Sequence, residues 1–150
     1  MNLILKDIII INNDYLNYLR NADSRVLMNH NDGIERPNIS VLIDNNGQLW
    51  AIPMSHKEFI TKDGKNVGES FYNIYLDCEN NPIGGHLKFN NMIPIADNTY
   101  ESAFKKYAYN ENYLNLLHKQ IQVIKSNLDE EITPRFNKAI FYRKKAISFN

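Results

Sequence analysis

A hydroxyl, an imidazole and an ammonium group fall within four consecutive residues of this chain. The segment is Met54-Ser55-His56-Lys57, and it follows an apolar run that is typical of a β-strand. RNA can be cleaved without a metal by attack of its own 2′-hydroxyl, provided that side chains move the protons and cations hold the charge of the phosphorane. Serine, histidine and lysine suit those tasks. They equally suit an ordinary exposed loop, and the local sequence leaves both interpretations open.

The other reactive side chains give weaker indications. The four histidines lie at positions 30, 56, 86 and 118, and no two have the i, i+4 spacing of a helical metal site. We therefore expect no metal and no cofactor. Cys78 lies between two acidic residues, which raise the pKa of a thiol, so a nucleophilic role is not expected. Gly84-Gly85 is not followed by a phosphate-binding motif and predicts a bulge or tight bend in a strand.

A β-hairpin is expected to carry Ser55. The apolar runs 39–43 and 48–52 flank Asn45-Asn46-Gly47, and Asn-Gly between two such runs is a hairpin signature because both residues tolerate positive φ. Pro53 fits the exit of the second strand, since proline cannot donate to a ladder. Ser55 is therefore predicted just beyond the end of a strand.

The rest of the first hundred residues also favours short strands. Residues 7–11 predict a buried strand, and Asn12 to Asp14 provide a turn and an N-cap for a short helix over about residues 14–21. Residues 22–38 form a polar loop that is long for a compact domain. Further strands are expected at residues 71–76, 84–89 and 92–95.

Helical spacing replaces this pattern near the C-terminus. It predicts one helix over about residues 111–128 and a second that begins at Thr133-Pro134, read as an N-cap followed by proline at N1. The acidic run 129–131 is interpreted as a solvated turn between them. We therefore expect an α+β fold in a single domain over residues 1–150: a small curled antiparallel β-barrel-like sheet, a short N-terminal helix and two C-terminal helices.

Charge limits the classes of partner. The chain has 150 residues, with 17 Lys and Arg against 17 Asp and Glu. Any contact with nucleic acid must therefore rest on a local patch rather than on net charge. Charged residues interrupt the apolar N-terminus, so we expect no signal or membrane segment and a cytoplasmic location.

Two features of the tail admit two interpretations each. Gln120 falls inside the apolar arc of the 111–128 helix, where its amide needs partners. It either bonds a backbone group at a sheet edge, or lies under an active-site groove and orients a catalytic side chain or RNA. The basic residues of the last helix form either a solvated face or a contact to the RNA backbone; they are Arg135, Lys138, Arg143, Lys144 and Lys145.

Five segments, in order along the chain, resemble segments of one known family. They are NNDYLNYL (12–19), RPNISVL (36–42), AIPMSHK (51–57), NNMIPI (90–95) and LHKQIQVI (117–124). Each is weakly specific alone, and the order of all five carries the resemblance, which spans about residues 8–142. The family is the ToxN/AbiQ toxins of type III toxin–antitoxin systems, and its CptN branch is also similar.

The resemblance implies a MazF/CcdB-like sheet and a sequence-specific, metal-independent endoribonuclease. Such an enzyme cuts single-stranded RNA by 2′-hydroxyl attack and leaves 2′,3′-cyclic phosphate and 5′-hydroxyl ends. The implied partner is an antitoxin RNA of pseudoknot repeats, whose precursor the toxin processes and with which it forms a closed hetero-oligomer. The implied role is phage defence by abortive infection, or growth arrest.

Site residues follow from the resemblance one by one. Ser55 matches the family's essential serine, Lys57 its active-site lysine and Tyr15 its active-site tyrosine, while Arg36 falls near a cation at the start of a strand. Met54 stands where some relatives have threonine, and His56 where some have proline. Contacts to RNA are expected from His56, Met54, Lys119, Gln120, Arg143 and Lys144.

Two other functions remain open on the sequence. One is a MazF-like ribonuclease restrained by a protein antitoxin. The other is a non-catalytic RNA-binding β-barrel adaptor, in which the Ser-His-Lys segment would be incidental.

Overall fold

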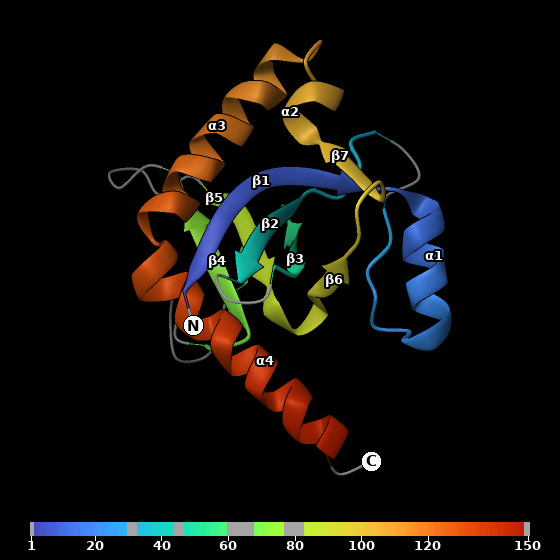
Figure 1. Ribbon diagram of the computed structural model, residues 1–150. Helices are drawn as coiled ribbons and strands as arrows, with labels where there is room; N and C mark the ends of the chain where they lie inside the picture. Colours follow the sequence, from blue (N-terminus) through green and yellow to red (C-terminus); the bar gives the residue numbers. More distant parts are fainter. Residues whose placement is uncertain (1, 30–32, 44–46, 60–67, 77–82, 149–150) are drawn as a thin grey trace.

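The computed structural model describes residues 2–29, 33–43, 47–59, 68–76 and 83–148, and for residues 144–148 only the helical backbone (Figure 1). Its elements follow in the order β1 (Leu3–Ile11), α1 (Asn13–Ala22), β2 (Asn38–Ile43), β3 (Leu49–Ser55), β4 (Phe71–Tyr75), β5 (Ile83–Lys88), the 3-10 turn η1 (Phe89–Asn91), β6 (Ile93–Ile95), β7 (Tyr100–Ser102), α2 (Ala103–Lys106), α3 (Glu111–Ser126), the π-helical turn η2 (Leu128–Ile132) and α4 (Thr133–Ser148).

The strands form one curled antiparallel sheet of seven strands. Its order is β4-β5-β3-β2-β1-β7, and β6 pairs with β3. β4 and β7 lie at the two ends of this order, and the described strands do not close into a barrel. The predicted α+β class and curled antiparallel sheet are confirmed, whereas the barrel-like closure is not: the sheet stays open.

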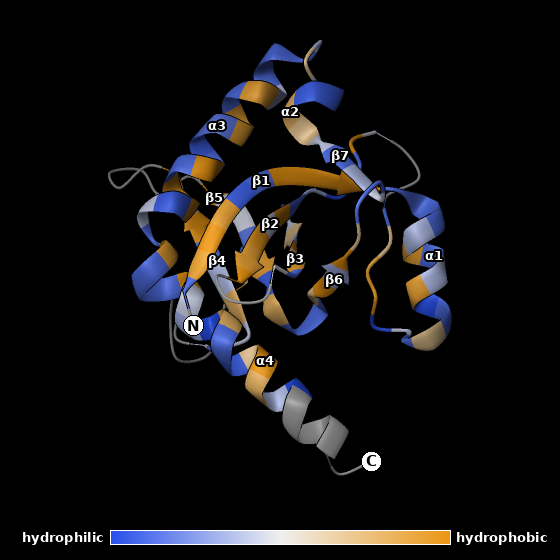
Figure 2. Cartoon of the chain, in the orientation of Figure 1, coloured by the Kyte–Doolittle hydropathy of each residue, from blue (hydrophilic) through white to orange (hydrophobic). Residues whose placement is uncertain are grey.

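Both faces of the sheet are covered, which explains the run of four isoleucines in β1. Ile8 and Ile10 belong to a large core that also contains residues of α3 and α4, such as Leu117 and Phe136. Ile9 and Ile11 belong to a smaller core on the other face, under α1. Strands that are buried on both faces read as continuous apolar runs, and the second half of β1 is such a band in Figure 2.

Pro53 lies inside β3 rather than at its exit. β6 pairs with residues 49–51 of β3, and β5 pairs with Met54 and Ser55 on the same side. Pro53 falls in the gap between these two partners, so its missing N–H leaves no ladder bond unmade. The predicted strand end at residue 52 is therefore too early, and Ser55 is the last residue of β3.

The hairpin and the first helix agree with the sequence. β2 pairs with β3 in antiparallel register, and Gly47 before β3 has a φ of 69°; Asn45 and Asn46 lie outside the described residues, as does Cys78. The Asn12 side chain accepts a hydrogen bond from the Tyr15 N–H at 3.0 Å, as expected of an N-cap.

The C-terminal helices form, but their junction differs from the prediction. Residues 129–131 belong to the π-helical turn η2, and α4 continues directly from it. Thr133 has helical φ and ψ of −57° and −45°, and its hydroxyl is buried without a hydrogen-bond partner. It is therefore not an N-cap, because an N-cap residue has extended angles and a bonded side chain. The short elements β7 and α2 were not predicted. Among the described helices, none combines the length and the apolar character needed to cross a membrane.

Candidate active site

Ser55 lies at the end of β3, on the face of the sheet opposite to α3 and α4. Side chains alternate along a strand, and Ile52 and Met54 both belong to the large core. Ser55 therefore shares with Ala51 the other face, where Ala51 packs in the smaller core under α1. Ser55 itself is half-buried. Met54 is 2% exposed, so the prediction that its side chain contacts RNA is wrong.

The Arg36 guanidinium contacts the main chain of the residue before this serine. Its Nη1 donates to the main-chain carbonyl of Met54 at 3.0 Å, and its Nε donates to that of Met28 at 3.3 Å. Of the carboxylates in the described ranges, none forms an ion pair with Arg36. Burial lowers the pKa of Arg36 from its ordinary value. A guanidinium held by two carbonyls still carries an uncompensated charge and spare donors, which suits an oxyanion.

Lys57 and His56 extend the site on its open side. Both side chains are exposed, and the Lys57 N–H donates to Ser55 Oγ at 3.4 Å, a long bond. The Ser55 hydroxyl thus lies between two cations. The half-buried Arg36 contacts the residue before it, and the exposed Lys57 follows it by two residues. This arrangement provides donors and positive charge for a phosphate group. Within the described ranges, His, Cys, Asp and Glu form no group of three that could hold a metal ion.

Two buried polar residues beside Ser55 escaped the sequence analysis. His86 is the β5 partner of Ser55, is 4% exposed, and has its Nδ1 2.6 Å from the carbonyl oxygen of Lys57. Asn73 on β4 is fully buried, accepts from the Phe59 N–H at 2.8 Å and donates to the Phe59 carbonyl at 2.8 Å. The sequence did contain a signal for them, because Asn73 and His86 each lie inside a predicted strand. A polar side chain that such a strand buries needs a hydrogen-bond partner.

Tyr15 lies nearer the other end of β3. Its hydroxyl donates to the carbonyl of Pro94 at 2.8 Å, and Pro94 pairs with Trp50. Burial raises the pKa of Tyr15, so the phenol stays protonated at neutral pH. Among the hydrogen bonds of the described residues, none joins Tyr15 to Ser55, although both lie on the same side of the sheet.

Among the residues predicted on the tail, those whose side chains the structure describes do not join Ser55. Gln120 is 6% exposed and its Nε2 donates to the Gly84 carbonyl at 2.8 Å. This is the first of the two arrangements considered for it, and its burial excludes a direct contact to RNA. Lys119 is exposed on α3, which packs on the opposite face from Ser55. Arg143 is half-buried, with its guanidinium carbon 5.6 Å from the centroid of the Trp50 ring. The Lys144 side chain lies outside the described part of the structure.

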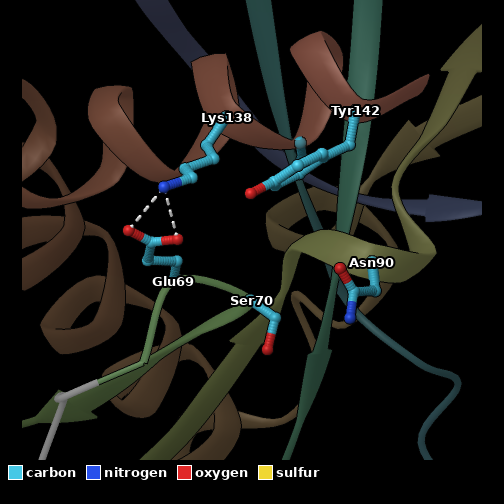
Figure 3. A pocket seen from close by; sticks show the side chains of 6 residues that line it. Glu69, Ser70, Asn90, Lys138 and Tyr142 are labelled. Carbon is cyan, nitrogen blue, oxygen red and sulfur yellow. Dashed lines mark hydrogen bonds and ion pairs between the residues drawn. The ribbon is translucent and has the colours of Figure 1, made fainter. Parts of the chain in front are cut away.

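A polar hollow lies beside α4. It encloses about 240 Å³ between α4, the start of β4 and η1 (Figure 3). Lys138 there forms an ion pair with Glu69 at 2.8 Å, and the hydrogen bond that its ammonium donates to the Glu69 carboxylate raises the pKa of Lys138. Because a carboxylate already compensates this ammonium, the hollow suits a phosphate less well than the surroundings of Arg36.

The model of the family described as toxin ToxN of type III toxin–antitoxin systems matches residues 7–149. An endoribonuclease ToxN of Bacillus thuringiensis subsp. kurstaki is 31% identical over 121 residues, which cover 79% of this chain. The chain spans 59% of the length of that relative.

Three solved structures have the same fold. The first comes from a bacterial type III toxin–antitoxin system whose toxin is selectively inhibited by a non-coding RNA pseudoknot; it is 28% identical, with a TM-score of 0.71 over 92% of this chain and 77% of that one. The second comes from a bacterial antiviral system regulated by a processed non-coding RNA, at 19% identity and a TM-score of 0.76 over 95% and 87%. The third is AbiQ, a lactococcal anti-phage endoribonuclease, at 20% identity and a TM-score of 0.62 over 96% and 82%.

The family model covers nearly the whole chain, and the segment that carries Ser55, His56 and Lys57 lies inside the matched region. The chain therefore belongs to the ToxN family of toxins from type III toxin–antitoxin systems.

Proposed function

We propose that this protein is a sequence-specific, metal-independent endoribonuclease that cleaves single-stranded RNA. The observation that carries the proposal is the Arg36 guanidinium. It is half-buried, has no carboxylate partner among the described residues, and donates to the carbonyl of the residue before Ser55. A half-buried positive charge without a carboxylate partner can bind a phosphate group. The relative at 31% identity, which is an endoribonuclease, supports the same function.

The proposed reaction needs only the RNA and side chains. The 2′-oxygen attacks the adjacent phosphorus, the bond from phosphorus to the 5′-oxygen breaks, and a 2′,3′-cyclic phosphate and a 5′-hydroxyl result. Arg36 and Lys57 hold the charge of the phosphorane, and the Ser55 hydroxyl donates to one of its oxygens. One group takes the 2′-proton and another returns a proton to the 5′-oxygen. His56, exposed next to Ser55, is the candidate for one of these tasks. Tyr15 is proposed for the other from the resemblance to the family, and it must reach the RNA from nearer the other end of β3, where its hydroxyl donates to the Pro94 carbonyl.

We further propose an RNA antitoxin as the partner. The solved toxin at 28% identity is inhibited by a non-coding RNA pseudoknot. By analogy, repeats of such an RNA would cover the Ser55 segment of this chain, in a closed hetero-oligomer, after the toxin has processed the precursor. A MazF/CcdB-like sheet, a cytoplasmic location and a role in phage defence or growth arrest belong to the same proposal.

Cleavage of an unstructured RNA in excess EDTA tests the reaction. We expect cleavage to persist and the products to carry cyclic phosphate and 5′-hydroxyl ends. Complete loss of cleavage in EDTA, with recovery on adding Mg²⁺ or Mn²⁺, would contradict the mechanism. Binding of RNA without any cleavage would favour the adaptor alternative.

A second experiment tests the partner. RNA transcribed from tandem repeats next to the gene should block cleavage when it is added to the purified protein. Inhibition by a short acidic protein encoded there, and none by the repeat RNA, would instead favour the MazF-like alternative.

A further inference from the structure

The segment that carries Ser55 and Lys57 leaves the sheet immediately after the serine. Residues 56–59 are in neither a helix nor a strand, so no ladder of backbone hydrogen bonds fixes them. Besides the long bond from the Lys57 N–H to Ser55 Oγ, three shorter side-chain bonds from other strands hold them. His86 Nδ1 lies 2.6 Å from the Lys57 carbonyl, and both the N–H and the carbonyl of Phe59 bond the Asn73 amide at 2.8 Å.

These two side chains lie in register with Ser55. His86 pairs with Ser55 between β5 and β3, and Asn73 pairs with His86 between β4 and β5. Three polar residues therefore line up across three adjacent strands. We call Asn73 and His86 the loop clamp, because each reaches from its strand to the backbone of the same short segment.

The two side chains of the loop clamp are buried, and their hydrogen bonds require one protonation state of His86. Asn73 is 0% exposed and His86 is 4% exposed. Since a carbonyl oxygen only accepts, Nδ1 of His86 must carry the proton in its bond to Lys57. The Phe59 ring lies 5.6 Å from the His86 ring and 4.5 Å from the Phe71 ring, and it packs over the clamp. Such bonds in a low-dielectric interior are costly to break.

We propose that Asn73 and His86 are positioning residues for RNA cleavage. They fix the backbone of Lys57 and Phe59, and so hold the Ser55 hydroxyl and the Lys57 ammonium in one arrangement before RNA binds. This inference rests on the proposed function. A preorganised site avoids reorganisation at the moment of reaction, and a displacement of about 1 Å can cost about 10²-fold in rate.

Substitutions at His86 separate positioning from mere stability. His86→Leu removes the bond to Lys57, whereas His86→Asn places an amide N–H near the position of Nδ1. We expect His86→Leu to lower the single-turnover cleavage rate about 10- to 100-fold, with RNA affinity changed less than about threefold. His86→Asn should recover most of the rate. If His86→Leu does not fold, His86→Gln replaces it, because its amide extends toward the position of Nε2 and misses the Lys57 carbonyl.

Ser40→Ala is the matched control. The Ser40 side chain is 2% exposed and also donates to a main-chain carbonyl, that of Asp7 at 3.1 Å, but it does not touch the loop. Ser40→Ala should therefore lower stability and leave the cleavage rate unchanged. A rate for His86→Leu equal to that of the wild type, at the same fraction folded, would overturn the positioning role.

Amide hydrogen exchange gives a readout that does not depend on RNA. In Asn73→Leu the Phe59 amide loses its acceptor, so its exchange should accelerate at least tenfold while amides in the centre of β1 stay protected. Unchanged exchange at Phe59 would overturn the clamp itself. If instead the wild type cleaves no RNA, the proposed function fails, and the positioning role fails with it. A cleaving wild type with an equally active His86→Leu refutes the positioning role alone.

Discussion

A β-carbon added to Gly85 would lie 2.0 Å from the carbonyl oxygen of Ser55. Gly85 has a φ of 89°, and the register of β4 and β5 shifts at this point, as predicted for Gly84-Gly85. The glycine thus lets β5 approach the last residue of β3 more closely than any side chain would permit. The position of Ser55 consequently depends on a residue that has no functional group.

Gly85→Ala is expected to displace Ser55. The substitution combines a positive φ with a clash against backbone, so we expect a loss of about 2–4 kcal/mol in the free energy of unfolding and near-complete loss of cleavage. Gly47→Ala is the control, because Gly47 has a φ of 69° but open space around its α-carbon; it should cost about 1 kcal/mol and spare activity. Urea unfolding and single-turnover cleavage measure both effects. Equal losses of activity in the two variants would contradict the role given to the contact.

The elements around the site could be predicted because their signals are local. Asn12 as an N-cap, the apolar runs on either side of Gly47 and the helical spacing after residue 111 each depend on a few neighbouring residues. The same kind of pattern predicted Ser55 just beyond a strand, and it is in fact the last residue of β3. Its grouping with Lys57 as a catalytic site came from the resemblance to a family, since the local sequence equally suits a loop.

The rest depends on pairing between distant strands. Pro53 is tolerated inside β3 only because β6 and β5 leave a gap there, and no local signal gives that gap. Met54 was expected to contact RNA because it precedes Ser55 in sequence, but tertiary packing buries it. The helical spacing placed Gln120 inside an apolar arc, yet the choice between its two interpretations needed the position of Gly84, which accepts its hydrogen bond. Likewise, the proposed role of Asn73 and His86 could not be predicted, because both bond the backbone of residues 57 and 59, which follow a different strand.

Arg36→Met is expected to abolish RNA cleavage while preserving the fold. Methionine keeps much of the volume but removes a half-buried charge that has no carboxylate partner in the described structure. The free energy of unfolding should therefore change by less than about 1 kcal/mol. Arg36→Lys should retain only part of the RNA affinity. A lysine keeps the positive charge, but it lacks the planar set of N–H donors with which a guanidinium can bond a carbonyl and a phosphate at the same time. Thermal unfolding and RNA binding are the measurements, and a large loss of stability with normal RNA binding would show a purely structural arginine.

Acidification should destabilise the wild type more than His86→Asn. Burial lowers the pKa of His86 below its ordinary value of 6.5. Between that lowered pKa and 6.5, the unfolded chain binds a proton that the folded chain excludes, so stability falls as the pH falls. The stabilisation is complete above 6.5 and is lost on approach to the lowered pKa. Urea unfolding midpoints at pH 7.5 and 5.5 measure this loss of stability. Equal changes in the wild type and in His86→Asn would show that His86 does not contribute to the pH dependence of stability.

The salt dependence of RNA binding should be shallow. The chain has no net charge, and Arg36 and Lys57 are the cations next to Ser55, so only a handful of phosphates should be neutralised. With about 0.7 per phosphate on a single strand, the slope of log K against log salt should lie near −2 to −4. Lys57→Ala should reduce it by about 0.7. A slope near −7 or steeper would reveal an extended basic surface that includes the α4 cations.

Ser55→Ala and Lys57→Ala should fail in different ways. The serine hydroxyl is proposed to act on the phosphorane, and removal of one preorganised donor costs about 10²–10³ in rate. Ser55→Ala should therefore fold, bind RNA normally and lose toxicity on expression. The Lys57 charge also acts on bound RNA, so Lys57→Ala should weaken binding as well as cleavage. Paired measurements of RNA affinity and single-turnover rate separate the two. A soluble Ser55→Ala protein that remains fully toxic would remove the serine from the mechanism, and a Lys57→Ala protein with unchanged affinity would make the lysine a group that acts only in the transition state.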